Sequence, residues 1–509
     1  MTNKDFENLN ERELDMLLED IVEAPPAGDM PQDINPWRKA MNRVLWGTGL
    51  TTLTLNFLNL DTILPAIGLI LLLLGYRTLR NENGWFKTAY IISAVRAVWF
   101  CISVFFQSTV LMEESEVATF LAVGTYVWLV PSFVSLLSLR NGIRTVQKKA
   151  GLAPHGGTGL LIWYLIILLL AFINFEGLAL WILIVAYCFI LRGLYKLSKE
   201  LTEAGYTVST SAVKVSDKAV ALAFVVILIV LGAIGYLFFN HYPMEWNTID
   251  TSRSEQVNTT AEELLALGFP ETILQDMTDE EILACEGASY VVAQSRDYDI
   301  LQNRGIGTQE EIDGGKRALI TPDQGEAHLR FTFIGVKFND DREHWKIIHH
   351  FEWLTDVDFC GTEAIQLWPS DRSGGWTMST DVTGRVLYEK DGITHAADYH
   401  SLEAVSYQKT GLLASMVGQY DNHDVFATFS LPNDGTRQRG YVMYDILELE
   451  DGCIVDSWFN YIHQKHPFQF PVKSAMEFEM TSSYGDGAAF QLIQAALQFT
   501  THGEIPRLI

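Results

Sequence analysis

The sequence predicts an α-helical membrane bundle of seven transmembrane helices and an extracytoplasmic α+β domain that is mainly an antiparallel β-sandwich or jelly-roll-like fold. Three observations lead to this fold class. Apolar runs of about the length that a bilayer requires fill the chain up to residue 240. Short segments from about residue 328 alternate apolar and polar residues, as half-buried strands do. The net charge changes sign between these two regions.

Charge and composition divide the 509 residues into five parts. An acidic tail, 1–37, carries ten acids and two bases, whereas residues 38–240 carry a net charge of +7. A polar stalk follows at 241–258, then a short-helix segment at 259–327 and a β-rich domain at 328–509; together these carry −25. Recognition of phosphate backbones needs a basic footprint, so this balance argues against nucleic acid as a partner.

The seven apolar runs are expected to cross the membrane because each is close to the ~20 residues that span a hydrocarbon core. They occupy residues 43–60, 62–80, 86–110, 117–139, 158–174, 177–196 and 219–240. The lipid bilayer is therefore the first predicted partner. The first run begins only after a long acidic tail, so it is expected to be an uncleaved anchor and not a signal peptide.

The links between the runs predict the orientation of the chain. Fifteen Lys and Arg residues occupy the tail junction and every second link, whereas the links around Asp61, 112–116 and 174–177 contain none. Cytoplasmic loops of membrane proteins carry the excess of Lys and Arg. We therefore expect the N-terminus in the cytoplasm and the chain after residue 240 outside the plasma membrane.

The acidic tail contains a stripe of apolar residues at helical spacing, followed by Pro25 and Pro26. A short amphipathic helix of this kind can dock in the groove of a cytoplasmic protein, with Leu14, Leu17 and Leu18 as anchors. The alternative is a disordered or membrane-lying tail. Acids repel the anionic inner leaflet, which favours a protein partner over the membrane surface.

Arg96 is the one basic residue well inside an apolar run. An intramembrane charge is costly and is by default a candidate for a functional site. The alternative is that its long side chain reaches the membrane interface. The runs contain almost no acids, which argues against an ion-coupled transporter.

Several local patterns predict the elements of the C-terminal half. Thr260 with Glu263 and Thr278 with Glu281 each fit a capping box at a helix start. Three Asp-Gly pairs, which begin at Asp391, Asp434 and Asp451, are typical of hairpin turns. The last apolar piece, 487–499, could be a helix or a strand, and a helix is favoured.

A metal site is the first chemical hypothesis for this half, and it depends on the segment "HWKIIHHFEW" at 344–353. On a strand, His350 and Glu352 share one face and could join His463 or His466, whereas His349 falls on the apolar face and is expected to be buried. No HExxH or paired-cysteine spacing accompanies them, so no cofactor is predicted.

Two further features leave the chemistry open. No nucleophile motif is present, which favours a protein that is not an enzyme. Trp368, Trp376 and Trp458 could stack on sugars, although core packing is the commoner use of tryptophan in a β-sandwich. At most one disulfide can form among Cys285, Cys360 and Cys453.

In layout, the chain resembles uncharacterised multi-spanning membrane proteins of Gram-positive bacteria, which implies a bacterial plasma membrane. It also resembles, in plan, membrane-anchored anti-sigma regulators, although it lacks their zinc-binding His/Cys motif. The leading hypothesis is a sensor or regulatory protein with an external sensing domain and a cytoplasmic docking tail. The alternatives are an external binding module, which could bind an envelope glycan as its ligand, and then a transporter or an external hydrolase.

Overall fold

The structure is a computed structural model, and the chain divides into two compact units that are described separately. One unit comprises the residues up to 106 together with 114–233, and the other comprises 107–113 together with 234–509. The described residues are 36–52, 59–113, 115–173, 179–208, 215–249, 252–300, 304–313, 316–323, 328–357, 359–368, 375–378, 381–408, 421–450, 452–467, 469–481, 489–500 and 507–508. The predicted tail anchors Leu14, Leu17 and Leu18 lie outside them.

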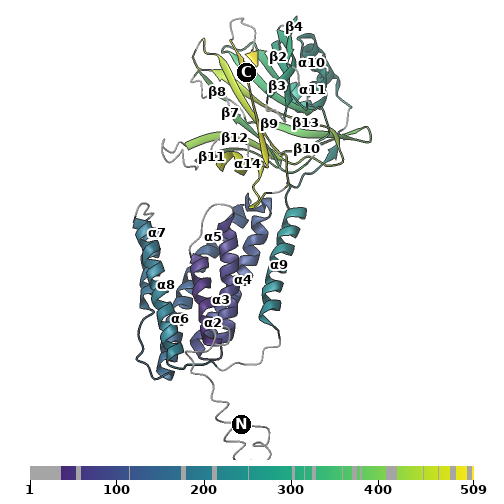
Figure 1. Cartoon of the computed structure of the whole chain (residues 1–509). Coiled ribbons are helices and arrows are strands. Elements are labelled where there is room, and N and C mark those ends of the chain that lie inside the picture. The colour runs from purple at the N-terminus through teal and green to yellow at the C-terminus, as the bar shows by residue number, and fades with distance from the viewer. Residues whose placement is uncertain are drawn as a thin grey trace, which may run out of the picture. The chain divides into compact units, whose positions relative to one another are not determined.

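The first unit is built from helices (Figure 1). The helices are α2 (Pro36–Thr52), α3 (Leu60–Leu79), α4 (Gly84–Gln107), α5 (Ser115–Val127), α6 (Leu129–Lys149), α7 (Thr158–Phe172), α8 (Ala179–Glu203) and α9 (Asp217–Phe238). A membrane-type helical part is therefore confirmed, but the count of seven spans is not. Four stretches of the described chain are long and apolar enough to cross a membrane: 60–79, 84–107, 116–149 and 217–238.

The difference in the count has a local reason at each of the other three predicted spans. The run 43–60 corresponds to α2, whose described part ends at Thr52. The run 158–174 corresponds to α7, which is apolar but has only 15 described residues. The run 177–196 corresponds to α8, whose C-terminal part is polar and charged. Length and apolarity of the described helices thus support four spans.

Helices α2 and α3 pack unusually closely along one seam. A Cβ atom on Gly47 of α2 would lie 2.7 Å from the carbonyl oxygen of Gly68, and one on Gly75 of α3 would lie 2.9 Å from the carbonyl oxygen of Ala40. Any larger side chain at these positions would push the two backbones apart. Small residues of this kind allow membrane helices to approach each other when no hydrophobic effect drives them together.

Charged side chains of several helices pair with one another in the helical unit. Arg43 of α2 and Arg77 of α3 both contact the Asp217 carboxylate at the start of α9, at 2.6 and 3.3 Å. Lys149, at the end of α6, lies 3.6 Å from Glu82. Three of the cations that the sequence places in alternate links are thus paired with carboxylates of the helical unit.

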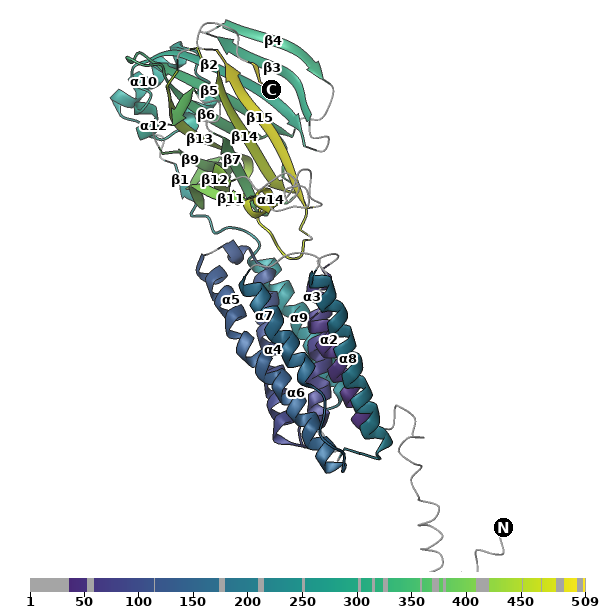
Figure 2. The same cartoon turned by 90° about the vertical axis from the view of Figure 1, so that its left-hand side faces the viewer.

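The second unit contains two antiparallel sheets (Figure 2). The larger runs in the order β1-β10-β9-β13-β6-β5-β2-β3-β4, with β8 also on β13, and the smaller runs in the order β11-β12-β7-β14-β15-β16. The strands of the larger sheet are β1 (Asn247–Thr248), β2 (Ala288–Asp299), β3 (Arg304–Asp313), β4 (Lys316–Asp323), β5 (Leu329–Phe338), β6 (His344–Trp353), β8 (Trp376–Met378), β9 (Thr383–Lys390), β10 (Ile393–Asp398) and β13 (Thr436–Glu448). Those of the smaller sheet are β7 (Glu363–Trp368), β11 (Ser401–Gln408), β12 (Asp421–Phe429), β14 (Val455–Gln464), β15 (Phe490–Phe499) and β16 (Arg507–Leu508).

The two sheets share one hydrophobic core, so the predicted sheet-rich, sandwich-like domain is confirmed in its coarse form. Phe331, Phe351 and Val442 come from the larger sheet, and Leu367 and Phe459 from the smaller. Strand β6 contributes its odd-numbered residues to this core, as the alternation along 344–353 predicts. His349 is accordingly buried, which confirms that prediction.

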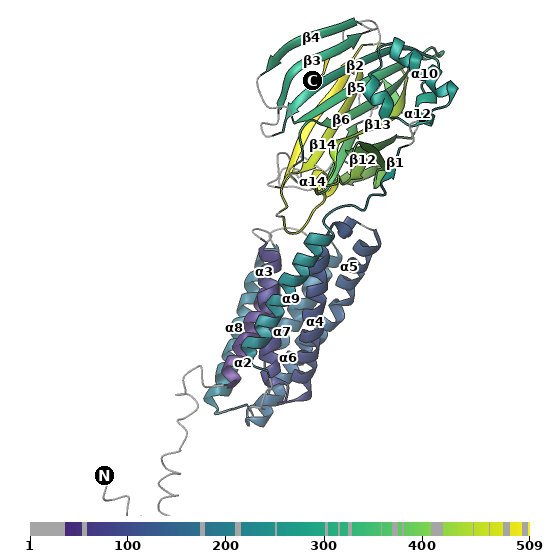
Figure 3. The ribbon, with the colours of Figure 1, turned by 90° about the vertical axis from the view of Figure 1, so that its right-hand side faces the viewer.

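Three short helices cover the other face of the larger sheet (Figure 3). They are α10 (Glu255–Ala266), α11 (Glu271–Asp276) and α12 (Asp279–Leu283). A second core forms here between the helices and the outward residues of β2, β5, β6, β9, β10 and β13. This layer buries a sheet face that an open sandwich would leave in water, and it positions the pocket described below. A further helix, α14 (Ala475–Thr481), packs on the smaller sheet.

Four local predictions have definite outcomes in this unit. The capping box at Thr278 and Glu281 is confirmed at the start of α12. The one at Thr260 is wrong, because Ser254 caps α10 and Thr260 lies inside that helix. The hairpin at Asp391-Gly392 is confirmed, since it joins β9 to β10 with positive φ at both residues. The turn at Asp434-Gly435 instead leads from one sheet to the other.

The strands also extend beyond the predicted region. Strands β2, β3 and β4 lie within 288–323, inside the segment expected to hold only short helices. The last apolar piece forms strand β15 and not a helix, because it pairs with β14 along its whole length, from Val455↔Phe499 to Gln464↔Phe490. The five cysteines are all free.

Candidate functional site

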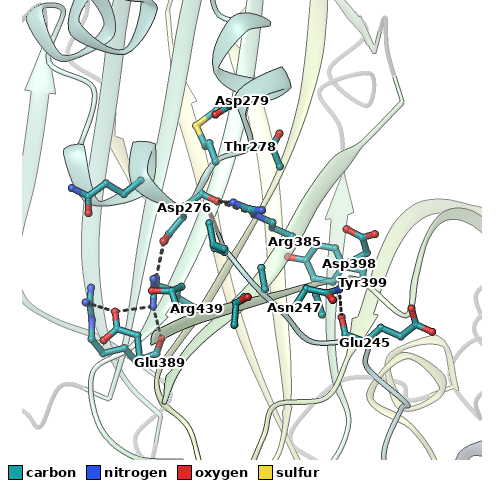
Figure 4. A pocket seen from close by; sticks show the side chains of 18 of the residues that line it. Glu245, Asn247, Asp276, Thr278, Asp279, Arg385, Glu389, Asp398, Tyr399 and Arg439 are labelled. Carbon is teal, nitrogen blue, oxygen red and sulfur yellow. Dashed lines mark hydrogen bonds and ion pairs between the residues drawn. The ribbon is translucent and has the colours of Figure 1, made fainter. Parts of the chain in front are cut away.

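A pocket of about 1110 Å³ opens in the β-rich unit between α11, α12 and the strands β1, β10, β9 and β13 (Figure 4). Its walls are mostly polar, and four arginines line it: Arg253, Arg385, Arg437 and Arg439. Strand β1 brings the chain that follows α9 into the wall through its pairing with β10, in which Asn247 lies opposite Ala396. The pocket is therefore bordered by four separate parts of the sequence, within 243–253, 272–280, 385–400 and 437–439.

Asp276, the last residue of α11, organises the buried end of the pocket. Arg439 of β13 directs its Nε at both carboxylate oxygens of Asp276, at 2.9 and 2.8 Å. His350 of β6 places its Nε2 atom 3.3 Å from the same carboxylate. All three side chains are almost completely buried. Burial by itself raises the pKa of the Asp276 carboxyl, but the hydrogen bonds from His350 and Arg439 outweigh it and hold the pKa below its ordinary value.

Arg385 of β9 fixes the same turn through the backbone. Its Nε and Nη2 donate to the carbonyl oxygen of Asp276 at 2.9 and 2.7 Å. That carbonyl ends α11, where helix carbonyls lack partners within the helix. Two residues later, Thr278 caps the start of α12, and its capping-box partner Glu281 accepts a hydrogen bond from the Tyr441 hydroxyl. The helix layer is thus joined to the sheet by polar contacts directly at the pocket.

The outer wall of the pocket is richer in acids. Glu245, Asp279, Glu280 and Asp398 line it. Arg437 extends from β13 to Glu389 at 2.7 Å. Arginines and carboxylates both line the pocket, so the site suits a polar ligand with both donors and acceptors. The arrangement does not form an anion trap, because its arginines contact carboxylates and carbonyls of the protein itself.

The structure separates the four residues proposed for a metal site. His350 lies beside the Asp276 carboxylate. The Glu352 carboxylate lies 3.5 Å from the guanidinium of Arg437, which lines the pocket. His463 points from β14 into the space between the sheets, where it contacts Trp353 and bonds Glu363 at 2.7 Å. His466 is exposed beyond the end of β14. Among the described residues, no group of three or more His, Cys, Asp or Glu could hold a metal ion.

The three tryptophans considered for sugar binding fall into two classes. Trp376 is buried in the core between the sheets. Trp368 and Trp458 lie opposite each other on β7 and β14, with ring centroids 5.9 Å apart and both partly exposed. Beside them, on the same face, Asn460 donates to Gln366 at 2.7 Å and Gln366 donates to Asp424 at 2.7 Å. These amide groups are buried, so only the two tryptophan rings are partly accessible here.

Sequence reasoning found the face that carries His350 and Glu352 but missed the residues that organise the site. Asp276 is one of many acids in its segment, and its partner Arg439 lies 163 residues away. The one local indication was the capping box at Thr278, which places a helix boundary directly after Asp276. Arg96 belongs to the helical unit and lines a separate cavity there.

Comparison with known proteins does not add to this geometry. No protein-family model matches the chain, and no curated protein matches it in sequence. The function must therefore be argued from the site itself.

Proposed function

We propose that this protein is a bacterial plasma-membrane sensor or regulatory protein. In this proposal seven helices cross the membrane, the tail lies in the cytoplasm and the β-rich unit lies outside. A polar ligand of the cell envelope binds in the pocket between α11, α12 and the β1 edge. The tail passes the response to a cytoplasmic partner through Leu14, Leu17 and Leu18.

The observation that carries the proposal is that the chain directly after α9 forms one wall of the pocket. Pro243, Glu245, Asn247 and Ile249 all line the pocket, and they follow α9 within a dozen residues of its last residue, Phe238. The same segment is held to the unit, because Tyr242 donates its N–H to the Ser430 hydroxyl at 2.8 Å. A ligand that contacts this wall therefore contacts the chain that leads into an apolar helix long enough to cross the membrane.

Two groups of contacts support the proposed orientation. Three of the cations expected in the cytoplasm, Arg43, Arg77 and Lys149, contact Asp217 or Glu82, as described above. The link after α4, which is free of Lys and Arg, belongs to the β-rich unit. There Val472 donates to the carbonyl oxygen of Gln107 at 2.7 Å, and Val110 donates to that of Phe239 at 3.0 Å.

Labelling of introduced cysteines in intact cells tests orientation and ligand together. We use the variants Asn247→Cys, in the pocket wall, and Glu403→Cys, at an exposed position on β11, both in a Cys453→Ser background. A membrane-impermeant maleimide is expected to label both. A soluble enzymatic digest of the cell wall is expected to slow labelling at position 247 and not at 403.

Two results would contradict the proposal. Labelling of both positions only after permeabilisation would reverse the orientation. Equal labelling with and without the digest would exclude the pocket as the binding site for envelope fragments. The tail is tested in the same cells: a Leu14/Leu17/Leu18→Ser variant should lose a cytoplasmic protein that copurifies with the parent.

A second candidate function is an envelope-glycan binding module without signalling. The observation that favours it is the partly exposed pair of rings of Trp368 and Trp458, whose centroids lie 5.9 Å apart. Accessible aromatic rings suit the apolar faces of sugars. If the digest binds through this surface, Trp458→Ala should abolish binding, and position 247 should label at the same rate with and without it.

A further inference from the structure

The helical unit contains a cavity of about 470 Å³ that is independent of the pocket in the β-rich unit. Residues from α2, α3, α4, α6, α7 and α8 line it. The residues that line this cavity are of two kinds, apolar and polar. Leucine and isoleucine side chains make much of the wall, and the remainder carries hydroxyl groups and one charge, that of Arg96. The hydroxyl-bearing side chains include Thr48, Tyr76, Ser132, Ser135, Tyr164 and Tyr187.

Arg96 lies at the middle of α4, which runs from Gly84 to Gln107. With a rise of 1.5 Å per residue, either end of the helix is roughly 16–18 Å away. That distance exceeds the length of an extended arginine side chain, so Arg96 does not reach the membrane interface from its position. The interpretation that the side chain merely extends to the headgroups is therefore disfavoured.

Within the described part of the chain, the structure gives Arg96 no ion pair and no hydrogen bond. Two carboxylates of the helical unit are paired with other cations. Asp217 contacts Arg43 and Arg77, and Glu82 contacts Lys149. Two phenols of the cavity direct their hydrogens elsewhere, Tyr187 to the carbonyl oxygen of Thr48 and Tyr164 to that of Leu129, both at 2.9 Å. Five guanidinium N–H donors thus face a cavity that supplies no carboxylate.

A guanidinium in an apolar region needs an anion, and its planar fork matches the oxygens of phosphate or carboxylate. Phosphate has more acceptor oxygens than a carboxylate, so it can accept more of the five guanidinium N–H groups. The leucine and isoleucine wall suits an apolar body attached to that anion. We infer that the cavity binds the phosphate head of an anionic amphiphile, with Arg96 as the principal ligand of the phosphate. This inference does not depend on the function proposed above.

The test uses the full chain in an uncharged detergent and three probes. The first is short-chain phosphatidic acid, the second is phosphatidylcholine with the same acyl chains, and the third is inorganic phosphate. Equilibrium dialysis with labelled probes gives the dissociation constants. We expect phosphatidic acid to bind more tightly than phosphatidylcholine, and inorganic phosphate to bind weakly because it lacks the apolar body.

Substitutions then assign the binding to the cavity. Arg96→Gln should weaken phosphatidic acid binding roughly ten- to a hundredfold, the range expected for losing hydrogen bonds to a charged group. Arg96→Lys keeps the charge without the fork and should lose less. The matched control is Arg80→Gln, because Arg80 caps α3 and lies over Tyr90, outside the cavity. It should bind like the parent.

Three outcomes would overturn the inference. Equal binding of the phosphatidic acid by Arg96→Gln and the parent would remove Arg96 as the ligand. Equal binding of the two lipids by the parent would remove the phosphate head as the recognised group, and this comparison needs no variant. Inorganic phosphate binding as tightly as phosphatidic acid would reject the amphiphile and leave a free phosphate as the source.

Discussion

Two arginines, one in each unit, are removed from bulk water in opposite ways. Arg439 has a side chain only 6% exposed and contacts the Asp276 carboxylate at 2.8 Å, with Glu389 at 3.6 Å. Arg96 lies at the centre of an apolar helix, and the described residues offer it no carboxylate. The first charge is balanced within the protein, whereas no described residue balances the second.

The difference separates a structural charge from a binding charge. Taking an ion out of water costs several kcal/mol, and a fold recovers this only through close, well-directed partners. In the β-rich unit those partners are present, so Arg439 contributes to holding α11 on the sheet. At Arg96 the described residues provide no such partner, and the inferred amphiphile would supply the compensating anion. Three changes in the β-rich unit, where buried charges are balanced or avoided, test this comparison, from the largest expected effect to the smallest.

Asp276→Ala should produce the largest effect, because it leaves Arg439 buried without its carboxylate. Breaking a buried ion pair from one side costs about 3–5 kcal/mol. The free energy of unfolding can be followed through Cys285, which is buried under the helix layer and becomes reactive to a thiol reagent only when that layer opens. Mapping of labelled peptides across a urea series separates Cys285 from the other cysteines.

Two controls sharpen this result. Asp398→Ala changes another acid of the same pocket, but an exposed one, and should alter stability by no more than about 0.5 kcal/mol. The double variant Asp276→Leu/Arg439→Met replaces both charges and should be less destabilised than Asp276→Ala alone. A double variant that is as unstable as the sum of its parts would mean that the two side chains act independently.

His349 shows a third way to bury a group that can be charged, which is to keep it neutral. It lies between Phe333 and Phe459, and its Nε2 is 2.7 Å from the Ser457 hydroxyl. Burial lowers the pKa of His349 to about 3. Between this value and the ordinary pKa of about 6.5, the unfolded chain takes up a proton that the folded chain does not. Folding therefore loses stability as the pH falls below about 6.5.

The expected loss between pH 7 and pH 5 is about 2 kcal/mol, at about 1.4 kcal/mol for each pH unit below the unfolded pKa. Unfolding in urea at both pH values, followed through the spectroscopic signal of the β-sheets, measures this loss of stability. His349→Gln removes the titrating group, so it should have a smaller difference between the two pH values whatever its absolute stability. Asp276 does not interfere, because its lowered pKa keeps its contribution intact until the pH falls below about 4. An unchanged pH dependence in the variant would assign the effect to other groups.

The sequence could predict what depends on local periodicity and not what depends on distant pairing. The alternation along 344–353 placed His349 in the core correctly, and the Asp-Gly pair at Asp391 gave a true hairpin. The segment 490–499 is rich in alanine, leucine and glutamine, which favour a helix locally, yet its pairing with β14 made it a strand. The Asp276–Arg439 pair joins positions 163 apart, and no local pattern marks either residue.

The smallest predicted effect concerns the turn that positions Asp276. Thr278 caps α12 by accepting from the Glu281 N–H at 3.2 Å, and loss of such a cap costs about 1 kcal/mol. Thr278→Ala should therefore weaken the helix layer by that amount, measured through Cys285 as above. Thr260→Ala is the matched control, because Thr260 has the same sequence spacing to a glutamate but lies inside α10, where its hydroxyl bonds the Gln256 carbonyl. There the gain in helix propensity from alanine offsets most of the lost methyl packing, so the net change should be close to zero. If both variants lose the same stability, the box at Thr278 does not hold the turn, and Arg385 and Arg439 alone would keep Asp276 in place.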